Sequence, residues 1–180
     1  QKAYEIDSIN FSAFDLIVVF HAGIGQDFSL PFLDPTPEDI PSTYVDNDMI
    51  ASYIGHNINI NEHTIWHGII LPETQNHLHY DIAESMFYGS SNPCEYQYGL
   101  TGTFALMIGF ATGLPPLWDT KNGVSGIGIF GLMDQGSNNG RGIIPAPPNA
   151  WTRYFLEWEE PVTVIPGESV SLPSRAENNV

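Results

Sequence analysis

The 180-residue sequence is poor in cysteine, in basic residues and in long hydrophobic runs. Its single cysteine, Cys94, cannot form an intramolecular disulfide or a zinc site built from several thiolates. Lys and Arg number 5 and Asp and Glu number 21, a formal charge of −16, which argues against the basic surface that binds nucleic acid or anionic lipid. No apolar run approaches the roughly 20 residues that span a bilayer. We therefore expect no nucleic-acid partner and no membrane insertion.

Apolar side chains are plentiful, since 42% of the residues are hydrophobic and 12% are aromatic, enough for a packed core. The length predicts a single domain over residues 1–172, with residues 173–180 as a linker or a cut end. Only 14% of the residues are charged, and a chain rich in Asn, Ser, Thr and Tyr with few lysines is typical of exported proteins. We expect an extracellular or cell-surface location, with a protein partner or self-association.

Strand and helix patterns alternate along the chain. The apolar run Phe14–His21 predicts a strand buried on both faces, and Thr64–Leu71 predicts a second strand that Pro72 ends. Leu100–Gly113 is apolar nearly all round and predicts a buried helix, ended by glycine and two prolines. Weaker patterns predict a short helix after the Pro- and Asp-rich loop 27–48, a helix or irregular segment over His77–Ser91, a helix over Ala150–Trp158 and a last strand over Pro161–Ile165.

Four segments of the second half carry a family resemblance. They read LMIGFATGLPPLWD (106–119), GIGIFGLM (126–133), PAPPNAW (145–151) and EWEEPV (157–162). In the same order, secreted metallopeptidases of the immune inhibitor A type have a zinc helix H-E-x-x-H-x-x-G-L-P-D-L-Y-D, a G-x-G-x-W-D-L-M turn, a P-x-x-P-x-A-W segment and a G-W-x-x-P-V strand. Phe14–Gly23 also looks like an early core strand of that family. The resemblance implies an α+β, zincin-like domain with a mixed sheet, one buried central helix and a loop-rich C-terminal part.

The metal-binding positions of that motif are replaced in this chain. Leu106 and Phe110 stand where the resemblance places the two histidines, Met107 where it places the glutamate that activates water, and Pro116 where it places the acidic third ligand. A zinc hydrolase needs three protein ligands, an open water position and a proton acceptor, and hydrocarbon or thioether groups supply none of these. We therefore predict no catalytic residue, no zinc and no required cofactor. Leu106 and Phe110, four residues apart on one helix face, should fill the former cleft.

These features indicate a catalytically inactive metallopeptidase-like module that serves as a structural or binding subunit at the cell surface. Two alternatives stay open. The chain could be an active metal-dependent peptidase with ligands recruited from elsewhere, such as His77, His79 and Glu84. It could instead be a subunit of a self-assembling extracellular structure.

Calcium is a further candidate, because acidic residues crowd the Pro-rich loop and the Gly-rich C-terminal loops. Carboxylate and backbone oxygens suit a hard cation, although no segment has EF-hand spacing. The candidate ligands are Asp27, Asp34, Asp39, Asp46, Asp48, Asp119 and Asp134.

Overall fold

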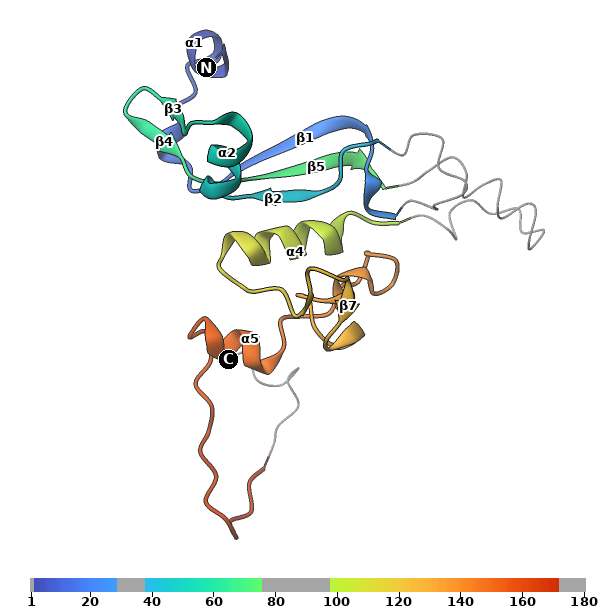
Figure 1. The fold of residues 1–180 in the computed structure, drawn as a ribbon. Helices are drawn as coiled ribbons and strands as arrows, with labels where there is room; N and C mark the ends of the chain where they lie inside the picture. The colour runs from blue at the N-terminus through green and yellow to red at the C-terminus, as the bar shows by residue number, and fades with distance from the viewer. Residues whose placement is uncertain (1, 29–37, 76–97, 172–180) are drawn as a thin grey trace, which may run out of the picture.

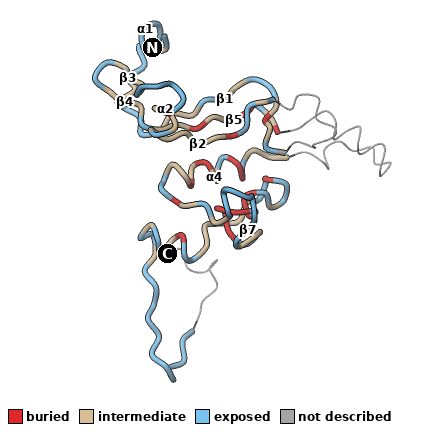
Figure 2. Tube along the Cα trace, in the orientation of Figure 1, coloured by how far each residue is buried: buried red, intermediate tan, exposed pale blue. Residues whose placement is uncertain are grey.

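The computed structural model describes residues 2–28, 38–75 and 98–171, which form an α+β arrangement with a small mixed sheet (Figure 1). A long helix, α4 (Thr101–Ala111), lies between that sheet and a loop-rich C-terminal part. Buried residues gather in the sheet, in α4 and in the loops that pack against α4 (Figure 2). This order of layers makes α4 the element on which both halves of the core depend.

The sheet has three strands in the order β1–β5–β2, so that β5 (Gly68–Thr74) is central. β1 (Ile17–Ile24) runs parallel to β5 and β2 (Thr43–Val45) runs antiparallel to it. The predicted strand Thr64–Leu71 is wrong in its bounds. Its first residues belong to β4 (His63–Ile65), and Pro72 lies within β5, opposite His21. The β1–β5 register shifts just after this pair, at the place where Pro72 has no N–H to donate.

The first predicted strand forms, but it is not buried on both faces. β1 is an edge strand, and Val19 and Phe20 are 52% and 60% exposed. β5 takes the central place instead, with Ile69 and Leu71 almost fully buried. Helix α4 contacts β2 and β5, and β1 is the strand of this three-stranded sheet farthest from it (Figure 1). The apolar side chains of β1 therefore lie partly outside the area of the sheet that α4 covers over β2 and β5.

The predicted central helix is confirmed within two residues at each end. Because α4 is apolar nearly all round, it can bury one face against the sheet and the other against the loops. On the sheet side Met107 joins Ile69 and Leu71 in one buried cluster. On the loop side Leu114, Leu132 and Met133 form a second buried cluster.

The remaining elements are short. The expected helix after the Pro-rich loop is α2 (Asn47–Ile54), and the helix predicted over Ala150–Trp158 is α5 (Ala150–Phe155). The predicted last strand over Pro161–Ile165 is wrong, because that segment is exposed and pairs with no strand of the described chain. The other elements are α1 (Lys2–Asp7), β3 (Ile58–Ile60), β6 (Trp118–Asp119), β7 (Val124–Ser125) and the 3-10 helices η1 (Phe11–Ala13), η2 (Gln26–Phe28), η4 (Gly128–Phe130) and η5 (Gln135–Asn138).

Among the described residues, no helix is both long and apolar enough to cross a membrane. The segment His77–Ser91 and residues 173–180 lie outside the described residues.

Candidate functional site on helix α4

Helix α4 carries three of the four positions at which the resembled family has its zinc site. Met107 is 8% exposed and packs with Ile69 and Leu71 of β5. Leu106 and Phe110, one helical turn apart, are half-buried and pack against both hydrophobic clusters. The expectation that these side chains fill the space beside the helix agrees with these contacts.

Phe110 is the centre of an aromatic group. Its ring stacks on that of Tyr44 from β2, with centroids 6.2 Å apart and planes 23° apart. The Trp118 ring meets it edge-on, with centroids 5.8 Å apart and planes 72° apart. Both distances fall in the range in which aromatic pairs attract each other beyond simple area burial. Phe110, which the resemblance aligns with a metal ligand, thus joins β2, α4 and β6.

Tyr44 links this aromatic group to a histidine. The Tyr44 hydroxyl lies 3.0 Å from Nδ1 of His67, and Nε2 of His67 lies 2.8 Å from the backbone carbonyl oxygen of Asp15. A carbonyl oxygen only accepts, so Nε2 carries a proton, and in the neutral imidazole Nδ1 accepts the Tyr44 proton. Burial raises the pKa of Tyr44, and the nearby Asp46 carboxylate raises it further, so the hydroxyl stays a donor. This pair was not predicted, because its partners lie far apart in the sequence.

Pro116 lies outside this packing. Gly113 ends the helix with a φ of +92°, and the Leu114 N–H donates to the Gly109 carbonyl 2.9 Å away. Leu114 then turns into the loop-side cluster, while Pro116 is exposed. The residue that the resemblance aligns with the acidic third ligand is therefore a surface proline, with no oxygen or nitrogen side-chain atom to offer a metal.

A buried carboxylate group, that of Asp134, holds the loops beside the loop-side cluster through hydrogen bonds. Asp134 is 5% exposed and precedes η5. Its Oδ2 accepts hydrogen bonds from the Ser125 hydroxyl and from the backbone N–H groups of Gly126, Ile127 and Gly128, at 2.7–2.9 Å, and its Oδ1 accepts one from the Gln135 N–H at 2.8 Å. Burial by itself raises the pKa of Asp134, but these hydrogen bonds outweigh it and the pKa is lowered. Asp134 acts as a cap and a loop anchor.

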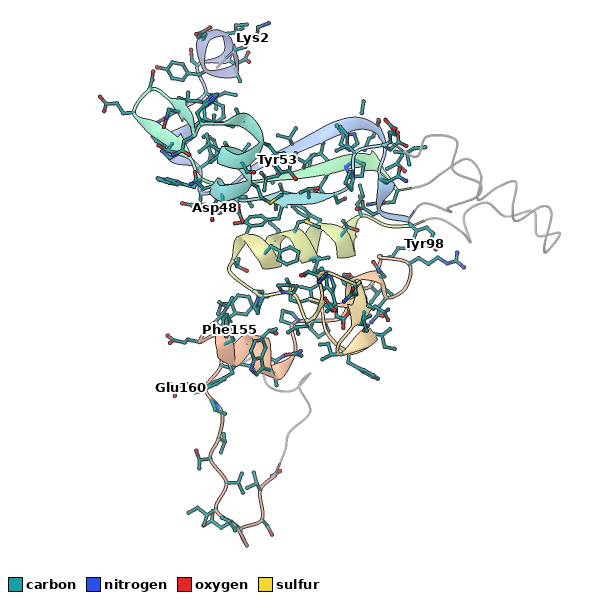
Figure 3. The ribbon with its side chains drawn as sticks, in the orientation of Figure 1. Lys2, Asp48, Tyr53, Tyr98, Phe155 and Glu160 are labelled. Carbon is teal, nitrogen blue, oxygen red and sulfur yellow. The ribbon has the colours of Figure 1, made fainter. Side chains whose placement is uncertain are left out.

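The other calcium candidates lie at separate places. Asp46 caps α2 by accepting from the Met49 N–H at 2.8 Å, and Asp48 lies in the first turn of that helix (Figure 3). Asp27 accepts from Ser42 and Gln75. Asp39 is half-buried near the start of the second described segment.

Asp119 is exposed and closes the β6–β7 turn. The side-chain hydrogen bond from Asn122 and the backbone hydrogen bond from Lys121 lower the pKa of its carboxyl group. Asp34 and the alternative ligands His77, His79 and Glu84 lie outside the described residues.

Within residues 2–28, 38–75 and 98–171, no three His, Cys, Asp or Glu side chains converge closely enough to hold a metal ion. Four of the candidate carboxylates, those of Asp27, Asp46, Asp119 and Asp134, accept hydrogen bonds from nearby donors of this chain. Calcium binding stays a prediction. The α4 site itself contains hydrocarbon, thioether and aromatic groups, which can pack and bind apolar surface but can neither hold zinc nor carry a proton.

Comparisons with protein-family models, with curated proteins and with solved structures found no match for this chain.

Proposed function

We propose that the chain is a catalytically inactive, zincin-like module of an extracellular or cell-surface protein, and that it acts by packing and binding rather than by hydrolysis. The observation that carries this proposal is the chemistry of the α4 site. Leu106, Met107 and Phe110 pack into the two hydrophobic clusters at the positions where a metallopeptidase would present two imidazoles and a carboxylate.

The packing argument supports a scaffold in two ways. Each buried apolar side chain contributes roughly 1.5–3 kcal/mol to folding, so replacing the ligands strengthens the core that joins sheet and loops. The same replacements remove the water-filled cleft that a hydrolytic metal requires. The site therefore stabilises the fold and supports a binding role rather than catalysis.

The test is a metal titration combined with a cleavage assay. Purified chain is incubated with excess zinc, desalted and analysed for bound metal, and it is then mixed with casein and with a mixed peptide library, with and without a chelator. We expect well under one zinc per chain and no chelator-sensitive cleavage. Stoichiometric zinc together with chelator-sensitive cleavage would contradict the proposal.

The second candidate, an active peptidase with ligands from elsewhere, makes the opposite prediction in the same assay. It further requires that His77→Ala or His79→Ala abolish both the bound metal and the cleavage. Glu84→Gln should then remove cleavage while metal binding persists, if that carboxylate takes the proton from water.

A further inference from the structure

Strand β1 combines the sequence of a buried strand with the environment of an exposed one. Its eight residues, IVVFHAGI, include no charged residue and no proline. Such continuous apolar runs are typical of strands covered on both faces. Val19 and Phe20 are adjacent, so they point to opposite faces of the sheet, and both are more than half exposed.

Among the described residues, no strand pairs with the outer edge of β1. β5 is the strand that pairs with β1 in the described part of the chain, so alternate N–H and C=O groups of β1 point away from the sheet. Folded proteins usually guard such an edge with lysine, proline, a bulge or a short strand. From Ile17 to His21 the ladder is regular and carries none of these guards. The irregularity begins after His21.

We propose that β1 is a self-association surface, and that two copies of this chain pair their β1 strands antiparallel across a two-fold axis to form one continuous six-stranded sheet. A two-fold axis perpendicular to the sheet keeps each face on its own side. The Val19 side chains of the two copies then meet on one face and the Phe20 side chains on the other. This arrangement places apolar side chains of the two copies beside one another on each face of the sheet, and it satisfies the outward backbone groups of both β1 strands.

Charge favours this surface over others for an identical partner. The chain carries a formal charge of −16, so two copies repel each other wherever acidic side chains face across an interface. β1 has no charged side chain from Ile17 to Ile24, and it is the longest strand of the sheet. A second copy supplies a strand of equal length and matching hydrophobicity. This inference concerns assembly and stands whether or not the chain hydrolyses peptides.

The repulsion also gives the association an unusual salt dependence. The Debye length shortens from about 14 Å at 0.05 M salt to about 4 Å at 0.5 M salt, so salt screens the like charges that surround the strand pair. We expect the dissociation constant to fall at least several-fold over that range. An interface held by ion pairs would weaken instead.

The experiment is sedimentation velocity on the 180-residue chain over a hundredfold concentration range at both salt concentrations, with two β1 variants and one control. Val19→Lys places a charged side chain on the edge strand at the position where the two copies meet, so it should oppose pairing there even though it lowers the net negative charge of the chain. Phe20→Thr removes the aromatic ring but keeps a residue that favours strands. Val124→Lys makes the same change at a similarly exposed valine, 62% exposed, on β7.

We expect a monomer–dimer equilibrium in the parent chain, at least tenfold weaker dimerisation in both β1 variants, and parent behaviour in Val124→Lys. Circular dichroism confirms that each variant is folded, and Phe20→Thr keeps the test valid if Val19→Lys unfolds. Amide hydrogen exchange at residues 17–21 should slow as protein concentration rises. A parent chain that stays monomeric at every concentration and salt overturns the proposal. So does a dimer that both β1 variants retain, or protection of residues 17–21 that is independent of concentration because another part of the chain covers the edge.

Discussion

The two sides of helix α4 are packed by different means. Toward the sheet, the contact is made by apolar side chains on regular elements, with Met107 against Ile69 and Leu71. Toward the C-terminal loops, a buried cluster of Leu114, Leu132 and Met133 is surrounded by chain with little helix or strand. That side depends on one carboxylate and on glycines at points where backbone meets backbone.

The difference shows how an irregular region reaches a defined structure. On the sheet side the strand ladder satisfies the backbone groups, so side chains need only fill space. On the loop side the backbone groups need other hydrogen-bond partners. One carboxylate oxygen of Asp134 accepts hydrogen bonds from three consecutive backbone N–H groups and from one hydroxyl group. Gly102 lets α4 approach η5 so closely that a Cβ there would lie 1.7 Å from the Ser137 carbonyl oxygen. Substitutions on the two sides of α4 should therefore lower the stability of the fold for different reasons.

The largest effect is expected from placing the polar residues of the resembled family on α4, at positions that pack against one or both clusters. The triple variant Leu106→His, Met107→Glu, Phe110→His removes three packed side chains and places polar groups in an apolar region, and each unsatisfied group costs about 1–3 kcal/mol. We expect a loss of at least about 4 kcal/mol in the free energy of unfolding, measured by urea titration. Zinc should rescue little of it, because Pro116 provides no third ligand. A variant as stable as the parent without metal would mean that this helix face borders an open groove.

The next effect tests the close approach on the loop side. Gly102→Ala forces a methyl group onto backbone that cannot move independently, so we expect a loss of about 3 kcal/mol despite the better helix propensity of alanine. Gly109→Ala on the same helix is the matched control. Its Cβ would lie 2.5 Å from the sulfur of Met133, a buried but unbranched side chain that can adjust more readily than backbone. Thermal melts should rank Gly102→Ala well below Gly109→Ala, and equal losses would contradict the rigid-contact argument.

Asp134→Asn should cost about 2 kcal/mol, because the amide keeps the shape but loses the charge and directs an NH₂ group toward donors. Asp119→Asn changes an exposed turn carboxylate and serves as the control, with a small effect expected. Urea unfolding of both variants at neutral pH makes the comparison. A loss at Asp119 as large as that at Asp134 would mean that burial of the carboxylate adds nothing.

The same carboxylate should shape stability in acid. The folded-state pKa of Asp134 lies below its ordinary value, so its contribution is present above the unfolded pKa of about 3.9 and disappears as pH falls through the folded pKa. The free energy of unfolding of the parent should therefore decline from about pH 4 downward. Asp134→Asn should show a shallower decline over the same range, measured by urea titration at a series of pH values. Parallel curves for parent and variant would rule out this role.

The smallest effect is expected at the hydroxyl that joins the aromatic group to His67. Tyr44→Phe keeps the ring stacked on Phe110 and removes one half-buried hydrogen bond, so we expect a loss of about 1 kcal/mol. A thermal melt resolves a change of that size. Tyr44→Leu, which also removes the stacking, should lose more, and equal losses would mean that the stacking contributes nothing.

The same contrast between the two sides of α4 explains which parts of the fold could be predicted from the sequence. The apolar pattern of residues 100–113 predicted α4, and the run before His21 predicted a strand, because burial against regular elements leaves a periodic or continuous signal. The position of β1 at an edge was not predictable, since strand order depends on contacts between residues distant in sequence. The last strand failed for a related reason: Pro161–Ile165 has a strand pattern but no described neighbour to pair with.

The residues of the candidate site could be selected from the sequence, but the contacts that they make with distant residues could not. The segment around Leu106 and Phe110 indicated that both side chains pack beside the helix, and their contacts agree with that packing. Asp134 was selected as a calcium ligand, which stays a prediction, and its hydrogen bonds to the segment from Ser125 to Gly128 were not predicted. The Tyr44–His67 pair left no signal, because nothing in a sequence marks two polar residues that meet only after the sheet has formed.

The parallel pairing of β1 with β5 has a consequence for the order of folding. Ile17 pairs with Gly68, so about 50 residues of chain must close into a loop before the first β1–β5 hydrogen bond forms. The contacts of α4 with the loops that follow it span shorter stretches of sequence and can form sooner. The C-terminal half should therefore be the early part of the folding reaction and the sheet the late part, with an unpaired β1 exposed in between. During synthesis and refolding, that interval is when neighbouring chains can exchange strands, so refolding yield should fall steeply as protein concentration rises.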